Sequence, residues 1–184
     1  MRRQQLLYIL SCLVFGAIGF SIVMAFDFEN GLSNSKIKGE ILEAFYFQSK
    51  GVEKKTLGSG WSRPEWWGTW SDGPKSTLAI DLYEPSRGDL ELEFVIKPFF
   101  TGGNQSQPVE LSVNGTIMVT WKLLPSKKWG TQRVRIPKNI WEAKRPAEIS
   151  FAYSEPQSPA KLGIGKDSRR LAIGLKTLTI RDLI

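Results

Sequence analysis

The sequence of 184 residues contains no histidine and a single cysteine, Cys12. Without histidine the chain lacks the commonest general base, the commonest zinc ligand and any switch based on histidine protonation. Because Cys12 lies in an apolar N-terminal run, the rest of the chain has no disulfide, cysteine nucleophile or thiolate metal site. There is also no G-x-S-x-G elbow and no phosphate-binding P-loop, so we expect no catalytic residue, no metal and no cofactor.

The charge is moderately basic, with 25 Lys and Arg against 18 Asp and Glu and a net charge of +7. Its basic doublets are dispersed over Lys54–Lys55, Lys127–Lys128 and Arg169–Arg170. A nucleic-acid-binding protein more often gathers its basic residues on one element, so we expect no nucleic-acid partner. Mild attraction to an anionic glycan or lipid head group fits this distribution.

A long uncharged run occupies residues 6–26. A helix of about 20 residues spans the hydrocarbon core of a bilayer, so this run predicts a single transmembrane helix. Basic residues precede it and acidic residues follow it, which predicts a cytoplasmic N-terminus and an exported remainder of the chain.

The fate of this segment has two interpretations. In the first, residues 1–26 are a signal anchor that stays in the membrane, and the length of the apolar run favours it. In the second, residues 1–25 are a signal peptide that is cut after Ala25. Residues 27–35 are rich in Asn, Ser and Gly and are interpreted as a tether.

From residue 36 onward the sequence is a series of short segments in which apolar and polar residues alternate. The pair Asn114-Gly115 predicts a β-hairpin, because both residues tolerate the positive φ of a type I′ turn. Strands are predicted over 37–47 (or a short helix there), 69–71, 78–83, 90–97, 109–113, 117–121, 132–136, 149–153 and 171–180. These eight or nine strands predict an all-β fold, an antiparallel jelly-roll-like β-sandwich over residues 36–184.

Four of the seven tryptophans, Trp61, Trp66, Trp67 and Trp70, fall within ten residues beside Glu65. Such a cluster is hard to bury because each indole N–H needs a hydrogen-bond partner. Exposed, it would be a large aromatic patch of the kind that marks an interaction site. Flat rings beside hydrogen-bonding groups suit sugars. We therefore predict carbohydrate stacking, and the alternative is that these tryptophans cap one end of the sandwich core.

A long loop over residues 155–171 contains two prolines and two glycines and precedes the last predicted strand. Asp167 and Arg169 point the same way if this piece is extended. In one interpretation Arg169 pairs with Glu65 or Asp167 and pins the loop to the tryptophan segment. In the other, these groups bind sugar hydroxyls or an anionic substituent, and the two are compatible. Glu65 and Asp167 also offer two carboxyls, which keeps a small glycan-modifying enzyme as an alternative.

Several motifs together carry a resemblance: Trp67-Gly68-x-Trp70-Ser71-x-Gly73, Val113-Asn114-Gly115 with Trp121, Ser158-Pro159, and Leu162-Gly163-x-x-x-Asp167-x-Arg169-x-Leu171-x-Ile173-x-Leu175. Over Gly60 to Ile180 the chain resembles a β-sandwich domain of bacterial envelope proteins. That domain is often appended to membrane glycosyltransferases or phosphoglycerol-transferase-like proteins. The resemblance implies a jelly-roll accessory domain acting on or near envelope polysaccharide. Ala172 departs from the family pattern, which tends to have glycine there.

We therefore predict a non-catalytic carbohydrate-binding accessory domain on the outer side of the bacterial cytoplasmic membrane, facing the periplasm or cell exterior. Its predicted partners are an envelope glycan or lipid-linked sugar, a membrane glycosyltransferase, and the membrane itself through residues 6–26. With no catalytic domain attached, it is expected to meet its enzyme as a separate subunit or to bind glycan alone. The main alternative is a subunit that docks on the transferase without binding glycan. The predicted carbohydrate-binding residues are Trp61, Glu65, Trp66, Trp67, Trp70, Asn114, Trp121, Asp167 and Arg169.

Overall fold

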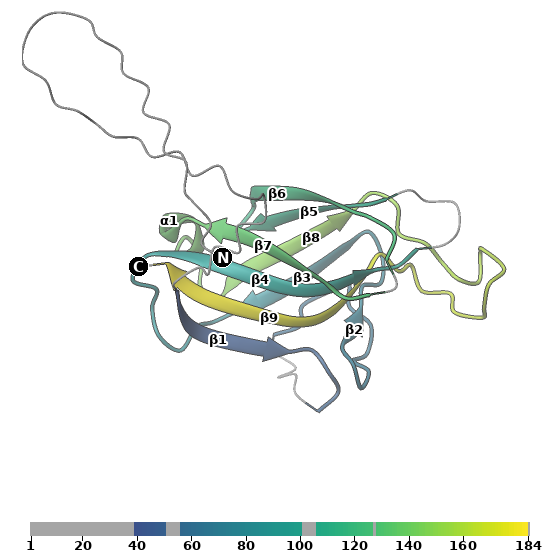
Figure 1. Cartoon of the computed structure of the whole chain (residues 1–184), viewed down its shortest axis with the longest axis horizontal. Helices are drawn as coiled ribbons and strands as arrows, with labels where there is room; N and C mark the ends of the chain where they lie inside the picture. Colours follow the sequence, from purple (N-terminus) through teal and green to yellow (C-terminus); the bar gives the residue numbers. More distant parts are fainter. Residues whose placement is uncertain (1–38, 51–55, 101–105, 127, 184) are drawn as a thin grey trace, which may run out of the picture. The chain divides into compact units, whose positions relative to one another are not determined.

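Nine β-strands and one short helix make up the part of the chain that the computed structural model describes, residues 39–50, 56–100, 106–126 and 128–183 (Figure 1). The elements are β1 (Glu40–Tyr46), β2 (Thr69–Trp70), β3 (Lys75–Ile80), β4 (Asp89–Pro98), β5 (Gln107–Val113), β6 (Thr116–Leu123), β7 (Gly130–Ile136), α1 (Lys138–Trp141), β8 (Ala147–Tyr153) and β9 (Ile173–Leu183). The predicted transmembrane helix, residues 1–26, and the tether, residues 27–35, lie outside the described residues. No helix within the described ranges has the length and hydropathy needed to cross a membrane.

The strands form two antiparallel sheets. One sheet has the order β1-β9-β4-β7, with β2 also paired to β9, and the other has the order β3-β8-β5-β6. Apart from β2, eight strands thus form two four-stranded sheets between which the chain crosses repeatedly, and this is the jelly-roll arrangement. The predicted all-β antiparallel sandwich is confirmed, and the described part of the segment 37–47 forms strand β1 over Glu40–Tyr46 rather than a helix.

The alternation seen in the sequence produces the core between the two sheets. In β4, Leu90, Leu92, Phe94 and Ile96 are all at most 1% exposed, as the alternating pattern predicts. Burying each such side chain contributes about 1.5–3 kcal/mol. Other strands supply the remaining core residues, among them Leu78, Val109, Leu111, Val113, Ile149, Phe151, Ile173, Leu175, Leu178 and Ile180.

The β5–β6 hairpin turns at Asn114-Gly115, where φ is 49° and 84°. Both values are positive, as a type I′ turn requires. The Asn114 side chain is also fully engaged, because its Nδ2 donates to the backbone oxygens of Ile140 (2.8 Å) and Trp141 (3.0 Å). Its Oδ1 accepts a hydrogen bond from the backbone N–H of Glu148 at 2.8 Å. Asn114 therefore ties the turn to α1 and β8.

The sandwich has two distinct ends (Figure 1). At one end β4 finishes at Pro98, β7 and β9 begin, and β2 pairs with β9; the loop over residues 154–172 also lies here. We call this the tryptophan end. At the other end, the α1 end, β4 begins and the backbone N–H of Lys138 donates to Asp89 Oδ1 at 3.0 Å.

Candidate functional site

Residues 60–72 fold back on themselves as a small hairpin that carries Trp66 and Trp67 at its tip. Four backbone hydrogen bonds close it, from Ser62 N to Trp70 O (2.8 Å), Asp72 N to Gly60 O (2.8 Å), Glu65 N to Gly68 O (2.7 Å) and Gly68 N to Glu65 O (3.4 Å). Gly68 is required at the tip, because its φ is 152° and a Cβ there would lie 2.3 Å from the backbone oxygen of Leu175. The local sequence thus presents the tryptophans at the tryptophan end.

Four aromatic rings form a row at this end, in the order Trp129, Trp67, Trp70 and Phe99. Successive ring centroids are 5.3, 5.2 and 5.8 Å apart, with interplanar angles of 47°, 72° and 88°. These tilted and edge-to-face contacts are the favourable geometry for aromatic pairs. We call these four rings the aromatic row.

Gly174 of β9 sets how closely the aromatic row approaches the sheet. It lies between Ile173 and Leu175, which are both fully buried, so its own position faces away from the core. A Cβ on Gly174 would come within 3.1 Å of the Trp67 ring and 3.3 Å of the Trp70 ring. The absence of a side chain at this position lets both rings rest against the backbone of β9.

The four clustered tryptophans have different environments. Trp66 is 82% exposed and makes no ring contact with another described aromatic residue. Trp67 and Trp70 are half-buried within the aromatic row. Trp61 instead packs against the core, where its ring lies 5.8 Å from that of Phe151 and its indole N–H donates to the Thr77 oxygen at 2.8 Å. Trp66 therefore has the freest ring face of the cluster, and Trp61 supports the fold.

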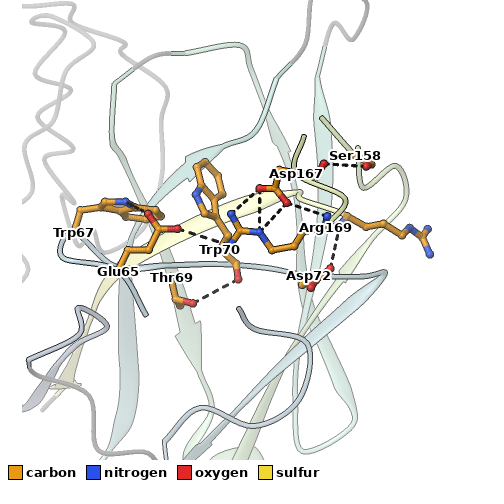
Figure 2. A network of polar contacts seen from close by, with 9 residues as sticks. Glu65, Trp67, Thr69, Trp70, Asp72, Ser158, Asp167 and Arg169 are labelled. Carbon is orange, nitrogen blue, oxygen red and sulfur yellow. Dashed lines mark hydrogen bonds and ion pairs between the residues drawn. The ribbon is translucent and has the colours of Figure 1, made fainter. Parts of the chain in front are cut away.

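A network of polar contacts connects the hairpin tip to the 154–172 loop (Figure 2). The Trp67 indole N–H donates to Glu65 Oε2 at 2.9 Å, and Glu65 Oε1 lies 3.7 Å from Arg169 Nη1. Arg169 in turn donates to Asp167 from Nε at 3.0 Å and from Nη2 at 2.6 Å. Arg169 therefore pairs with both carboxylates, as the first interpretation of the sequence predicted.

These contacts fix the charge state of Asp167. Hydrogen bonds from the Arg169 side chain lower the pKa of the Asp167 carboxyl below its ordinary value, and burial opposes them only in part. The same hydrogen bonds raise the pKa of the Arg169 guanidinium. The pair is consequently a fixed anion beside a fixed cation at neutral pH. Within the described residues, no group of three or more His, Cys, Asp or Glu could hold a metal ion.

Replacing Arg169 by glutamine should raise the pKa of the Asp167 carboxyl toward its ordinary value of about 3.9. A pKa depressed by folding contributes stability that is present above the ordinary pKa and is lost as the pH falls through the folded value. The natural chain should therefore lose this contribution in acid, and R169Q should lack it at neutral pH. Carboxyl ¹³C NMR titration measures the pKa directly.

The matched control is R170Q, because Arg170 is exposed and contacts Asp72 only through its backbone N–H, at 3.0 Å. That variant should leave the Asp167 titration unchanged. An Asp167 pKa that is the same in R169Q and in the natural chain would contradict the charge pairing described above.

The predicted site residues are only partly brought together. Glu65, Trp66, Trp67, Trp70, Asp167 and Arg169 belong to the hairpin and network at the tryptophan end, and we call them the tryptophan surface. Asn114 lies at the α1 end with its side chain committed to backbone groups. Trp121 is 7% exposed and packs in the core, 5.8 Å from the Phe94 ring.

Two aromatic residues of the row, Phe99 and Trp129, were not predicted from the sequence. The sequence feature that could have indicated them is their position next to strand ends. Phe99 follows the predicted strand over 90–97, and Trp129 precedes the one over 132–136. Only strand pairing shows that they meet the tryptophan hairpin. Ile96 is opposite Gly130 in the β4–β7 ladder, and Lys97 is opposite Gly174 in the β4–β9 ladder.

Fold and surface together define a jelly-roll β-sandwich with an aromatic surface at one end. The chain belongs to the family described as Domain of unknown function (DUF7024), whose sequence model matches residues 33–182. No curated protein matches it.

Similar solved structures include a family GH115 4-O-methyl-alpha-glucuronidase with specificity for decorated arabinogalactans (TM-score 0.47, 8% identity). The alignment covers 79% of this chain and 18% of that enzyme, so the chain spans less than a fifth of its length. Another is the CBM36-1 domain of a multidomain xylanase from the hindgut metagenome of Trinervitermes trinervoides (TM-score 0.40, 14% identity). That alignment covers 75% of this chain and 96% of the domain. A third is a family 35 carbohydrate-binding module from Clostridium thermocellum (TM-score 0.37, 12% identity). That alignment covers 75% of this chain and 97% of the module.

Proposed function

We propose that the chain is a non-catalytic carbohydrate-binding domain whose binding site is the tryptophan surface. The observation that carries this proposal is Trp66, which is 82% exposed at the hairpin tip and adjoins Glu65 in the chain. A tryptophan offers about 150–250 Å² of area for burial, so leaving one exposed forgoes substantial stabilisation. A ligand that covers the ring would recover that stabilisation.

A sugar matches the chemistry of this surface. A pyranose ring has an apolar C–H face that can lie on the indole of Trp66 and a rim of hydroxyl groups that need donors and acceptors. The carboxylate of Glu65, the residue next to Trp66 in the chain, would supply an acceptor, and the Arg169 guanidinium would supply donors. Because the network already orders these groups, little conformational freedom would be lost on binding.

The charge state of Asp167 supports binding rather than hydrolysis. A glycosidase of the common type needs one carboxyl that stays protonated to donate to the leaving group, which requires a raised pKa. Arg169 lowers the pKa of the Asp167 carboxyl and also lies 3.7 Å from Glu65. Asp167 is thus arranged to stay charged beside a cation and does not fit the role of the protonated carboxyl.

The cellular setting that we propose follows from the N-terminal sequence. Residues 6–26 would hold the domain at the outer side of the bacterial cytoplasmic membrane, since Arg2 and Arg3 precede this run and acidic residues follow it. There the domain would assist the assembly or modification of an envelope polysaccharide or lipid-linked sugar. A membrane glycosyltransferase is the partner that this role implies.

One observation favours the alternative of docking on a transferase without glycan. Leu162 and Ile164 are 41% and 62% exposed on the same loop as Asp167. Exposed apolar side chains beside an aromatic surface also suit a protein partner. This alternative predicts that the domain recognises the transferase and binds no glycan.

Binding to an array of bacterial envelope glycans, followed by calorimetric titration, separates the two. The full chain would be used in phosphatidylcholine nanodiscs. We expect at least one glycan to bind with a dissociation constant of about 1 mM or lower, which corresponds to about −4.1 kcal/mol. Absence of binding to every glycan on the array, with the transferase bound, would support the docking alternative instead.

A further inference from the structure

Two adjoining hollows lie beside the aromatic row. The first has a volume of about 450 Å³ and is lined by Trp70, Phe99 and Lys97, among others. The second has a volume of about 320 Å³, and both hollows share Pro98 and Ser126. Both volumes fall in the range of about 300–1,000 Å³ that is typical of small-molecule sites. The aromatic row therefore borders concave space large enough for sugar rings.

The charged side chains that line the two hollows are of one sign. Lys97 lines the first hollow, and Lys122 and Lys128 line the second. At the other end of the row, Lys176 Nζ lies 5.8 Å from the centroid of the Trp129 ring. Among the described residues that line the hollows, lysine is the only charged type.

These lysines also lack carboxylate partners. In the parts of the chain that the structure describes, no Asp or Glu oxygen lies within 4.0 Å of any of the four ammonium groups. On the sheet that contains β4 and β7, by contrast, Arg133 Nη2 is paired with Glu93 Oε2 at 2.7 Å. Unpaired like charges next to a concave surface focus a positive potential there.

We propose that the two hollows bind a glycan that carries anionic substituents, either carboxylate or phosphate groups. This inference rests on the proposed carbohydrate-binding function and specifies its ligand class. Trp70 and Phe99 would hold a sugar ring of the glycan other than the one on Trp66, and Lys97, Lys122 and Lys128 would receive the charged substituents. Lysine suits this role because its ammonium is a point charge on a flexible stem, which accepts either anion without fixed geometry.

The binding test compares polymers that have the same sugar backbone with and without the charged group. Polygalacturonate is paired with its methyl ester for the carboxylate, and dextran phosphate is paired with dextran for the phosphate. With the full chain in phosphatidylcholine nanodiscs, we expect one charged polymer to bind at least about tenfold more tightly than its neutral counterpart. The preference should fall as ionic strength rises above about 0.15 M, because exposed charges are screened.

Two double variants locate the effect. K97Q/K122Q removes two charges from the hollows, and K138Q/K144Q removes two from the α1 end. We expect the first to weaken binding of the charged polymer at least about tenfold and the second less than about twofold. Thermal unfolding should be nearly the same for both, since surface substitutions usually change stability by less than about 0.5 kcal/mol.

The outcomes separate this inference from the function on which it rests. Equal binding of charged and neutral polymers, unaffected by K97Q/K122Q, would overturn the inference and leave carbohydrate binding standing. An equal loss in both double variants would overturn it as unspecific attraction. Binding to phosphatidylglycerol vesicles alone would overturn it in favour of a lipid surface. Failure of every polymer and of the glycan array would overturn both proposals.

Discussion

Replacing Trp66 by alanine should lower glycan affinity at least about tenfold, or about 1.4 kcal/mol, and leave the free energy of unfolding unchanged. The side chain is 82% exposed, so its removal costs few packing contacts. Surface substitutions of this kind usually change stability by less than about 0.5 kcal/mol. Calorimetric titration with the best glycan of the array and a thermal melt of the same sample measure the two quantities.

Tyr83 provides the matched control, because it is an aromatic residue that is 94% exposed and follows β3 at the α1 end. Y83A should retain both the affinity and the stability of the natural chain. If W66A and Y83A bind glycan equally well, the tryptophan surface is not the binding site. A large drop in the melting temperature of W66A would show instead that the ring has a structural role.

Replacing Trp121 by alanine should destabilise the fold by about 3–5 kcal/mol, the usual cost of deleting a large aromatic side chain from a core. Trp121 is 7% exposed and meets Phe94 edge to face at 65°. The loss is a large share of a typical domain stability of about 5–15 kcal/mol. Denaturant unfolding measures it by linear extrapolation.

The conservative variant W121F should lower the free energy of unfolding much less, since it keeps an apolar ring at the same position in the core. Glycan affinity of the fraction that remains folded should be unchanged in both variants. A folded, fully stable W121A with reduced affinity would restore the role in carbohydrate binding that the sequence suggested for Trp121.

Much of the fold could be predicted because its signals are local. A strand with one buried face is buried at every second residue, and β4 shows this from Leu92 to Pro98. The Asn114-Gly115 turn could be predicted for the same reason, because its φ preferences belong to the two residues themselves. The partners of the Asn114 side chain could not, since they lie 26 to 34 residues away in sequence.

The site was predicted less completely because it depends on contacts between distant segments. The hairpin around Trp66 is a local feature and was singled out from the sequence. Trp129 joins it only through the pairing of β4 with β7 and β9. Trp121 looked like another surface indole, yet it points to the same side of β6 as Leu123, which is also buried.

Gly174 together with Trp67 and Trp70 is a pattern by which this end of the sandwich can be identified in related sequences. A methyl group at this position would sit 3.1 Å from Trp67 and 3.3 Å from Trp70, so the rings would have to shift by a few tenths of an ångström. The glycine and the two indoles are thus one steric unit, although about a hundred residues separate them in the chain. Family members that have exchanged one part of this unit should therefore have exchanged the others.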